Sequence, residues 1–456
     1  MQNSTNNHTT IAALATGPGG AIALIRLSGP QAVAIAQSVF SKPLADAKGY
    51  TVHFGTVSDG DCVLDEVLVT LFRAPKSYTG EDMVEISCHG SSYITSELLA
   101  LLIRKGATPA MAGEFTQRAF LNGKLDLSQA EAVADLIASE SGAAHRIALN
   151  QMRGGYAAEL AVLRDKLLHI TSLLELELDF SEEDVEFADR VELHRLLNEI
   201  KNRCQSLAGS FRTGNVLKNG VPVAIVGAPN AGKSTLLNRL LGEERAIVSD
   251  IAGTTRDFIE ESLTLEGIRF RFIDTAGLRH TEDTIEALGI ERTKERIQRS
   301  MLVLLLIPEP LSPDEIEERI RSLQLSEEQQ LIVLLNKSDL WNTSSLTEKF
   351  ESIYPVLSIA ARSGEGLESL KSFLIKSVEA DIPEESLVVS NIRHYEALLH
   401  ASEALERAIA ALTNGLPADL ISEDVRQVLY QLGTITGEIT TEDILGNIFG
   451  KFCIGK

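Results

Sequence analysis

A glycine-rich loop between an apolar run and an amphipathic helix restricts the fold of this chain more than any other feature. The segment VAIVGAPNAGKST, residues 223–235, spaces Gly227, Gly232, Lys233 and Ser234 as G-x-x-x-x-G-K-S. The run before the loop is typical of a buried strand, and TLLNRLLG at its end is typical of a helix. This is the context of a phosphate-binding loop in a parallel α/β sheet. A chance glycine turn is the alternative, and the flanking elements disfavour it.

The residue types of this loop indicate how it would bind a nucleotide. Glycines let backbone N–H groups curl around a β-phosphate, Lys233 reaches the β- and γ-phosphate oxygens, and Ser234 offers an oxygen to Mg²⁺. The run IRFRFIDTAG adds a strand of alternating apolar and arginine residues, and Asp274 follows its end. We expect Asp274 to hold Mg²⁺ through water, and Gly277 to let the backbone turn toward the γ-phosphate.

A third segment indicates which base is bound. The run LIVLLNKSDL is a buried strand that ends in Asn336, Lys337 and Asp339. A carboxylate accepts two hydrogen bonds from guanine N1–H and the 2-amino group, a pair that adenine lacks, so Asp339 predicts GTP rather than ATP. In the following IAARSGEG segment, Ala360 and Ala361 are predicted to offer backbone N–H groups to the base oxygen. The order of the three motifs resembles the translation-factor-like superfamily of GTPases.

The segment VSDIAGTTRD, residues 248–257, lies where the switch loop of a GTPase falls, with an ordinary polar loop as the alternative. Thr255 is predicted to ligate Mg²⁺ and to sense the γ-phosphate. Ras-like enzymes place a water-orienting glutamine after the D-T-A-G turn, but Leu278 stands there, and the sequence offers no evident arginine finger. We therefore expect a monovalent cation, held by Asn230 and switch-loop oxygens, to neutralise transition-state charge.

The predicted GTP-binding residues come from the phosphate loop, the switch loop, the D-T-A-G turn and the two base-binding segments. They are Asn230, Ala231, Gly232, Lys233, Ser234, Thr235, Ser249, Asp250, Ile251, Ala252, Gly253, Thr254, Thr255, Asp274, Thr275, Ala276, Gly277, Asn336, Lys337, Asp339, Ala360, Ala361 and Arg362. Among them, Lys233 and Thr255 are predicted to be catalytic. Ser234, Thr255 and, through water, Asp274 are predicted to hold Mg²⁺.

The chain around this segment has mixed and helical texture. AIALIRLSG and DEVLVTLF read as strands, and 96–104 reads as a helix. No proline occurs from 110 to 221, and an apolar stripe at helical spacing predicts the core of a helix bundle: Leu193, Leu197, Ile200, Cys204, Leu207 and Phe211. The segment RTGNVLKNG, residues 212–220, is predicted to be a polar connector. Helical texture returns from 391 to 446.

We therefore predict a multidomain chain of α/β and α+β parts. A P-loop GTPase domain at 218–381 is inserted into an all-α domain made of 122–217 and 382–456, after an α+β domain at 1–121.

With 42 Lys and Arg against 64 Asp and Glu, the net charge of −22 makes this chain a poor non-specific binder of nucleic acid. Four scattered cysteines, no signal peptide and no run long enough to span a bilayer predict a soluble protein of a reducing cytosol.

Three further segments carry a resemblance that covers almost the whole chain. APKSYTGEDMVEISCHG (74–90), AGEFTQRAFLNGKLDLSQAEAVADLI (112–137) and the terminal FCIGK (452–456) are similar to signature segments of the MnmE (TrmE) family of tRNA-modifying GTPases. The resemblance implies that the N-terminal domain binds tetrahydrofolate and forms a homodimer. It also implies a cytoplasmic heterotetramer with the flavoprotein GidA (MnmG), which holds the FAD.

The same resemblance implies the reaction and its site residues. The two proteins would add an aminomethyl or carboxymethylaminomethyl group to C5 of the wobble uridine of certain tRNAs. The carbon would come from 5,10-methylene-tetrahydrofolate, of which 5-formyl-tetrahydrofolate is an analogue. By matching residues, Arg26, Glu85, Lys124 and Lys456 would contact the folate, with surface ion pairs as the alternative. Glu85 would bond the pterin, and Arg26 and the two lysines would suit the glutamate tail. Cys453 is either a thiol near the folate or an idle one at the terminus.

For the GTPase step, the resemblance implies a K⁺ site and a transient dimer of G domains. Asn230, Ser249, Ile251 and Thr254 would bind K⁺, and Glu286 would position the attacking water. Two other functions are alternatives: a GTPase that acts in ribosome assembly or as an RNA chaperone, and a folate-binding scaffold without GTPase activity. The acidic net charge disfavours the first. The complete set Lys233, Ser234, Thr255 and Asp274 disfavours the second.

Overall fold

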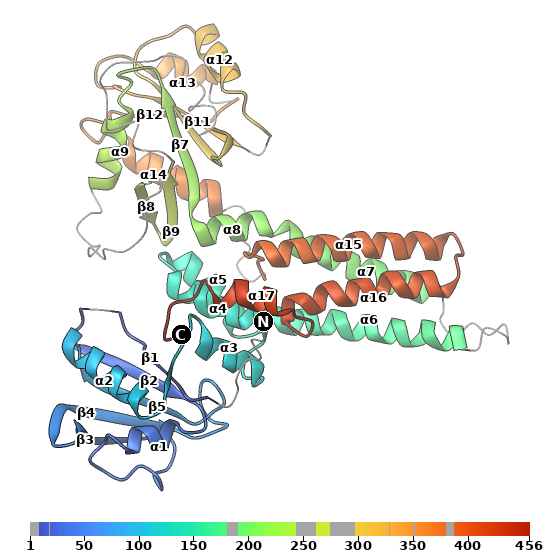
Figure 1. Cartoon of the computed structure of the whole chain (residues 1–456). Helices are drawn as coiled ribbons and strands as arrows, with labels where there is room; N and C mark the ends of the chain where they lie inside the picture. Colours follow the sequence, from blue (N-terminus) through green and yellow to red (C-terminus); the bar gives the residue numbers. More distant parts are fainter. Residues whose placement is uncertain are drawn as a thin grey trace. The chain divides into compact units, whose positions relative to one another are not determined.

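In the part of the chain that the structure describes, two six-stranded sheets and a set of long helices make up the fold (Figure 1). The computed structural model describes residues 9–17, 19–179, 190–242, 261–273, 297–327, 329–350, 353–379 and 387–456. The chain divides into two units: Met1–Ile137, Asn150–Lys201 and His400–Lys456 form the first, and Ala138–Leu149 and Asn202–Leu399 form the second. The four domain ranges given above stay predictions.

The sheet of the first unit has the strand order β3-β4-β5-β2-β1-β6. Its neighbouring strands are antiparallel except for β1 with β6, which are parallel. The strands and the helices between them are β1 Ile11–Leu14, β2 Ile22–Ser28, α1 Ala32–Gln37, β3 Thr51–Asp59, β4 Cys62–Phe72, β5 Met83–His89, α2 Ser92–Arg104 and β6 Thr108–Pro109.

The two faces of this sheet differ because side chains alternate along a strand. On β2, Ile25 and Leu27 are buried in a core that also takes in side chains of α1 and α2. Arg26 lies between them and therefore belongs to the opposite face. On β5, Val84 and Ile86 are likewise in the core, and Glu85 lies on the face of Arg26. Register pairs Arg26 directly with Glu85.

The second sheet has the order β12-β11-β10-β7-β9-β8, parallel throughout except for the antiparallel pair β8–β9. Its strands and helices are β7 Val221–Gly227, α9 Lys233–Gly242, β8 Glu261–Leu265, β9 Ile268–Phe272, β10 Leu302–Ile307, α12 Pro313–Ser322, β11 Gln330–Leu335, α13 Ser344–Phe350, β12 Val356–Ser358 and α14 Leu367–Glu379. The predicted α/β sheet is confirmed, and β9 has the predicted alternation of buried and half-buried residues.

Strand β10 shows why the predicted buried run is continuously apolar. Leu302, Leu304 and Leu306 pack into one hydrophobic core, whereas Val303, Leu305 and Ile307 pack into another on the other face. A parallel strand covered on both faces needs apolar residues at every position. In the part of the chain that the structure describes, no helix is long and apolar enough to cross a membrane.

Helices make up most of the remaining described residues. In the first unit they include α3 Glu114–Leu121, α4 Leu127–Ala138, α6 Gly155–Asp179, α16 Ala418–Thr436 and α17 Glu442–Phe449. Helices α6 and α16 pack side by side (Figure 1). Helices α5 Gly142–Met152, α7 Arg190–Gly209 and α15 Ile392–Thr413 run across the boundaries of the two units. The stripe on α7 is buried as predicted, from Leu193 to Leu207.

The predicted connector at 212–220 is wrong. Residues Phe211–Asn219 form helix α8, and only Gly220 breaks it, with φ 88°. Gly214 misled the prediction because a glycine inside a polar segment usually marks a turn. Here it allows close packing instead: a Cβ on Gly214 would lie 2.2 Å from the carbonyl oxygen of Val389.

Candidate functional site

The phosphate-loop motif lies between β7 and α9, at the carboxyl end of a central strand, where parallel α/β sheets bind their ligands. Gly227 has φ 156° and Gly232 φ 98°. A Cβ on Gly232 would lie 2.4 Å from Nδ2 of Asn336, so no side chain fits at this position. Asn230 is exposed at the tip with φ 59°, a left-handed conformation that asparagine tolerates better than most residues. The loop therefore has the backbone of an anion cradle.

Lys233 begins α9 and extends along the loop. Its Nζ donates to the carbonyl oxygens of Gly227 and Ala228, both at 2.9 Å. An ammonium has three donors, so these two bonds hold the charge at the loop. Leu236 N donates to Gly232 O at 2.9 Å and closes the first turn of the helix. Loop and helix N-terminus thus both direct positive potential to the place where a phosphate would bind.

Asn336 joins the phosphate-loop motif to the segments predicted to bind the base. It is 2% exposed, its Nδ2 donates to Ala231 O at 2.7 Å, and its Oδ1 accepts from Ala361 N at 3.1 Å. Both polar atoms of the buried amide are therefore bonded. Asn336 holds together the end of β11, the phosphate loop at Ala231, which is 105 residues away in the sequence, and the loop at Ala361. The sequence predicted Asn336 for the site but not this bridge.

The Asp339 carboxylate projects from a tight turn after β11. Asp339 is exposed, Lys337 has φ 62°, and Leu340 N donates to Lys337 O at 2.8 Å. In the next loop, Ala360 N donates to Glu365 O at 2.9 Å, and Ala361 N is bonded to Asn336. Either amide would therefore have to share its hydrogen to reach a base oxygen.

Part of the predicted nucleotide site lies outside the described residues. This part comprises Ser249, Asp250, Ile251, Ala252, Gly253, Thr254, Thr255, Asp274, Thr275, Ala276, Gly277 and Glu286, together with Leu278. Of the predicted Mg²⁺ ligands, the structure describes Ser234, which is half-buried at the start of α9. Of the predicted K⁺ ligands, it describes Asn230.

A second group of predicted site residues meets on the sheet of the first unit. Arg26 donates through Nε and Nη2 to one oxygen of Glu85, at 2.9 and 2.8 Å, and its Nη1 donates to Gly455 O at 3.3 Å. The Arg26 and Glu85 side chains are only 15% and 19% exposed. The guanidinium also lies 5.7 Å from the ring centre of Tyr78 and 5.6 Å from that of Phe115. These contacts form a half-buried charged group between aromatic rings.

The chain terminus is part of this group. Ala112 and Ile454 form a β-bridge, and Gly113 N donates to Cys453 O at 3.4 Å. Phe452 is buried against side chains of α4 and α17. Gly455 has φ 94°, and a Cβ there would lie 2.3 Å from Leu14 O, so the glycine lets the terminus lie against β1. The terminal FCIGK segment is thus docked beside Arg26.

The other predicted folate residues are placed around this centre. Lys456 follows Gly455 directly and is half-buried. Lys124 is exposed, and its Nζ donates to Pro75 O at 3.1 Å. Cys453 is an exposed free thiol. The structure therefore brings together Arg26, Glu85 and the terminus, and it does not show Lys124 in contact with them.

The sequence did not predict that the rings of Tyr78 and Phe115 lie beside Arg26, although both residues belong to the segments that carry the family resemblance. Tyr78 OH shares a hydrogen bond with Thr116 Oγ1 at 2.9 Å, and burial raises the pKa of this phenol. Phe115 precedes Thr116 on α3 and is fully buried. Only the pairing of the 77–82 loop with α3 brings the two rings to Arg26.

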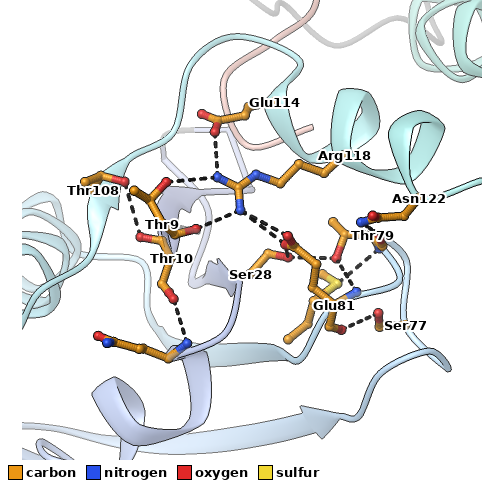
Figure 2. Close-up of polar contacts among 12 residues, drawn as sticks. Thr9, Thr10, Ser28, Ser77, Thr79, Glu81, Thr108, Glu114, Arg118 and Asn122 are labelled. Carbon is orange, nitrogen blue, oxygen red and sulfur yellow. Dashed lines mark hydrogen bonds and ion pairs between the residues drawn. The ribbon is translucent and has the colours of Figure 1, made fainter. Parts of the chain in front are cut away.

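A buried arginine network fastens that loop to α3 (Figure 2). Arg118, 3% exposed, donates to Glu114 at 2.8 Å, to Glu81 at 3.3 Å and to Thr9 O at 2.8 Å. Glu81 also accepts from Ser28 Oγ at 2.6 Å. One cation thereby satisfies two carboxylates and ties α3 to the sheet and to the loop that carries Tyr78.

Comparison with known proteins gives consistent matches along the whole chain. The model described as GTP-binding protein TrmE N-terminus matches residues 10–124, and the model described as MnmE helical domain matches residues 127–453. A protein of Cytophaga hutchinsonii named tRNA modification GTPase MnmE is 52% identical over 457 residues, which cover 99% of this chain and 99% of that protein. Proteins of the same name from Bacteroides fragilis and Flavobacterium johnsoniae are each 51% identical and cover 99% of this chain and 100% of their own length.

Proposed function

Because the chain belongs to the MnmE family of tRNA modification GTPases, we propose that it hydrolyses GTP in the modification of C5 of the wobble uridine of certain tRNAs. The observation that carries the GTPase part is the Asn336 bridge. Asn336 begins the turn that would select guanine, and its side chain bonds Ala231 of the phosphate loop and Ala361 of the next loop. The backbone at Gly232 supports it, because this residue has φ 98° and a Cβ there would collide with the Asn336 amide that forms the bridge.

In this proposal, each of the predicted site residues has a role in nucleotide binding or hydrolysis. Lys233 neutralises charge on the β- and γ-phosphates, and Asp339 accepts from the guanine base. Ser234, Thr255 and, through water, Asp274 would hold Mg²⁺, which would supply positive charge for the phosphates. K⁺ would be held by Asn230, Ser249, Ile251 and Thr254. Glu286 would place the water once two G domains associate.

We also propose that the Arg26 group binds 5,10-methylene-tetrahydrofolate. Glu85 can accept from the amino and ring N–H groups of a pterin, as Asp339 does from guanine. Arg26 is bonded to Glu85, so the two residues would meet the same end of the ligand, with Tyr78 and Phe115 beside it. Lys124 and Lys456 are then the residues of the predicted set left for the glutamate tail, and Cys453 is the thiol nearest in sequence to the Gly455 contact.

The open face of the first sheet supports the proposed homodimer. Val52, Phe54 and Leu68 are 60%, 55% and 46% exposed on the outer strands β3 and β4. They lie on the same face as Arg26 and Glu85, opposite α1 and α2. Apolar side chains gathered on an open sheet face favour burial against a second protein surface.

The remaining partners follow from the charge and from the chemistry. A chain of net charge −22 needs a local basic surface or a partner to hold tRNA, and the flavoprotein GidA (MnmG), with its FAD, would be that partner in a heterotetramer. We place this complex in the cytoplasm.

The experiment that tests the GTPase part is single-turnover hydrolysis of GTP by the full-length protein with Mg²⁺ and KCl. We expect hydrolysis by the parent and loss of it in Lys233→Ala with the fold retained. Equal rates in parent and variant would overturn the assignment of the loop.

A further inference from the structure

We propose that Trp341 is a positioning residue for guanine selection, which acts by fixing the turn that carries Asp339. The inference rests on the proposed nucleotide site and goes beyond it, since no motif assigns a role to this tryptophan. Its indole Nε1 donates to the carbonyl oxygen of Asn336 at 2.9 Å.

This bond closes the base-binding turn around Asp339. The turn begins at Asn336, the last residue held to the sheet, whose N donates to Ile307 O at 2.8 Å. It then passes through Lys337, whose φ of 62° is costly for a residue with a side chain. Ser338 N donates to Ile359 O at 3.1 Å. Asp339 itself is exposed, so its backbone must be held by its neighbours.

Trp341 is suited to hold that backbone because its ring is anchored. The ring packs against the hydrophobic core that contains Phe350 and Leu346 of α13. The indole N–H therefore comes from a fixed body and ends on the residue that also bridges to the phosphate loop. A carboxylate that must accept two hydrogen bonds from one base edge needs an orientation set within about 10–20°. Fixing both ends of a six-residue turn supplies that constraint.

Two substitutions separate the hydrogen bond from the packing. Trp341→Phe keeps an aromatic ring in the core and removes the donor. Trp341→His removes the larger ring but can place an N–H where the indole N–H lies. The loss of one hydrogen bond corresponds to about three- to tenfold in affinity. We expect Trp341→Phe to lower the affinity for GDP by this factor and to lower the preference for GDP over IDP, which lacks the 2-amino group. Trp341→His should keep more of that preference than Trp341→Phe.

A double-mutant cycle tests whether the effect passes through Asp339. GDP affinities are measured by calorimetry in full-length parent, Trp341→Phe, Asp339→Asn and the double variant. We expect the Trp341→Phe effect to vanish in the Asp339→Asn background. Phe350→Leu, which disturbs the same core and leaves the Trp341 donor in place, is the matched control and should not change the GDP to IDP ratio. The single tryptophan of the chain gives a second readout, because its emission should shift when GDP binds.

The outcomes are distinct from those of the proposed function. A parent protein that binds no guanine nucleotide contradicts the nucleotide site itself. A parent that binds GDP, with additive effects in the cycle or with an equal change in Phe350→Leu, leaves the site standing and overturns the role of Trp341. If Trp341→Phe does not fold, Trp341→His is compared with the parent instead. A GDP to IDP affinity ratio equal to that of the parent then supports the hydrogen bond, and a lost preference for GDP contradicts it.

Discussion

The side-chain amide of Asn336 donates to the backbone carbonyl of Ala231 at 2.7 Å, across 105 residues of sequence. This single bond ties the segment proposed to recognise the base to the loop proposed to hold the phosphates. In the proposed site, the distance between the base and phosphate subsites would therefore be fixed before a nucleotide binds, which would lower the ordering cost of binding.

Asp339→Asn should exchange guanine for xanthine selectivity. The amide cannot accept from both guanine N–H groups, but it can donate to the C2 carbonyl of xanthine. We expect GDP affinity to fall at least tenfold and xanthosine diphosphate to bind better than GDP, as measured by calorimetry. Glu348→Gln removes one exposed carboxylate of α13 and serves as the control. GDP affinity equal to that of the parent would rule out Asp339 as the base acceptor.

Arg26→Ala and Glu85→Gln should each abolish binding of a reduced folate. Arg26→Ala leaves the half-buried Glu85 carboxylate without its cation, and Glu85→Gln leaves the half-buried Arg26 without its counter-charge, in the group that would meet the ligand. Equilibrium dialysis of the full-length protein with 5-formyl-tetrahydrofolate is the measurement. The control is Arg104→Ala, which breaks an ion pair to Asp59 that is about half exposed on both sides. If the two variants bind the folate as the parent does, its site lies elsewhere.

Arg118→Met should destabilise the first unit strongly. It would leave the carboxylates of Glu81 and Glu114, 13% and 14% exposed, without their cation. Removing one partner of a buried ionic group costs about 3–5 kcal/mol, whereas the exposed Arg104→Ala should cost within about 1 kcal/mol. Urea unfolding of both variants gives the comparison. A similar small loss for both would show that the network adds no more than a surface pair.

GTP hydrolysis should respond to the monovalent cation. We expect rates in KCl to exceed those in NaCl of equal ionic strength on the order of 10²-fold, since charge placed at the β–γ bridge acts on the transition state. G domains should associate only with K⁺ and GDP–aluminium fluoride. Equal rates in both salts, with monomeric G domains, would refute the cation mechanism.

Substitutions of Asn230 test the cation mechanism only if the positive φ of this residue is taken into account. Its φ of 59° makes Asn230→Ala a strained change, and Asn230→Gly is not strained. Both variants should lose the K⁺ response while they bind GDP. Loss in Asn230→Ala alone would indicate backbone strain rather than a lost ligand. Glu286→Ala, which lies outside the described residues, should slow turnover and leave GTP binding intact.

The four cysteines should differ in reactivity in the order of their surroundings. Cys62 and Cys453 are exposed, whereas burial raises the pKa of Cys88, with a further contribution from the charge of Asp65, and raises that of Cys204 to about 12. Iodoacetamide at pH 8 should label Cys62 and Cys453 first, as read by peptide mass spectrometry. Rapid labelling of Cys204 in the folded protein would contradict its burial.

The raised pKa of Cys204 also has a consequence for stability. The folded state favours the neutral thiol, so its contribution is complete below the unfolded value of 9.0 and is lost as pH rises toward about 12. Parent protein should therefore lose stability between these values more steeply than Cys204→Ala, in urea unfolding at each pH. Parallel curves would show that the thiol does not titrate differently in the two states.

The nucleotide motifs could be predicted from the sequence because each is local. Gly232 and Lys233 are neighbours where the loop meets α9, and Asp339 follows its own strand, so the spacing of residues alone predicts the chemistry. The Arg26–Glu85 contact is different, because 59 residues separate the pair and only the register of β2 on β5 brings them together. The family resemblance predicted both residues as folate ligands. Neither composition nor periodicity could predict that they lie side by side.

Other features depended wholly on packing. Gly214 looked like a turn residue and proved to be a close contact inside α8. Phe115 and Tyr78 carry no pattern that marks them as site residues. Nothing in the sequence shows that the indole N–H of the half-buried Trp341 meets the Asn336 carbonyl oxygen. Such contacts are set by the tertiary fold and therefore appear only with it.

Mass spectrometry of wobble nucleosides tests the proposed function most directly. Total tRNA would be compared from cells that contain the chain, cells that lack it, and cells that lack it but express either the parent or Lys233→Ala. We expect the C5 modification of the wobble uridine to disappear without the chain and to return with the parent but not with Lys233→Ala. An unchanged set of wobble nucleosides in cells that lack the chain would contradict a role in tRNA modification.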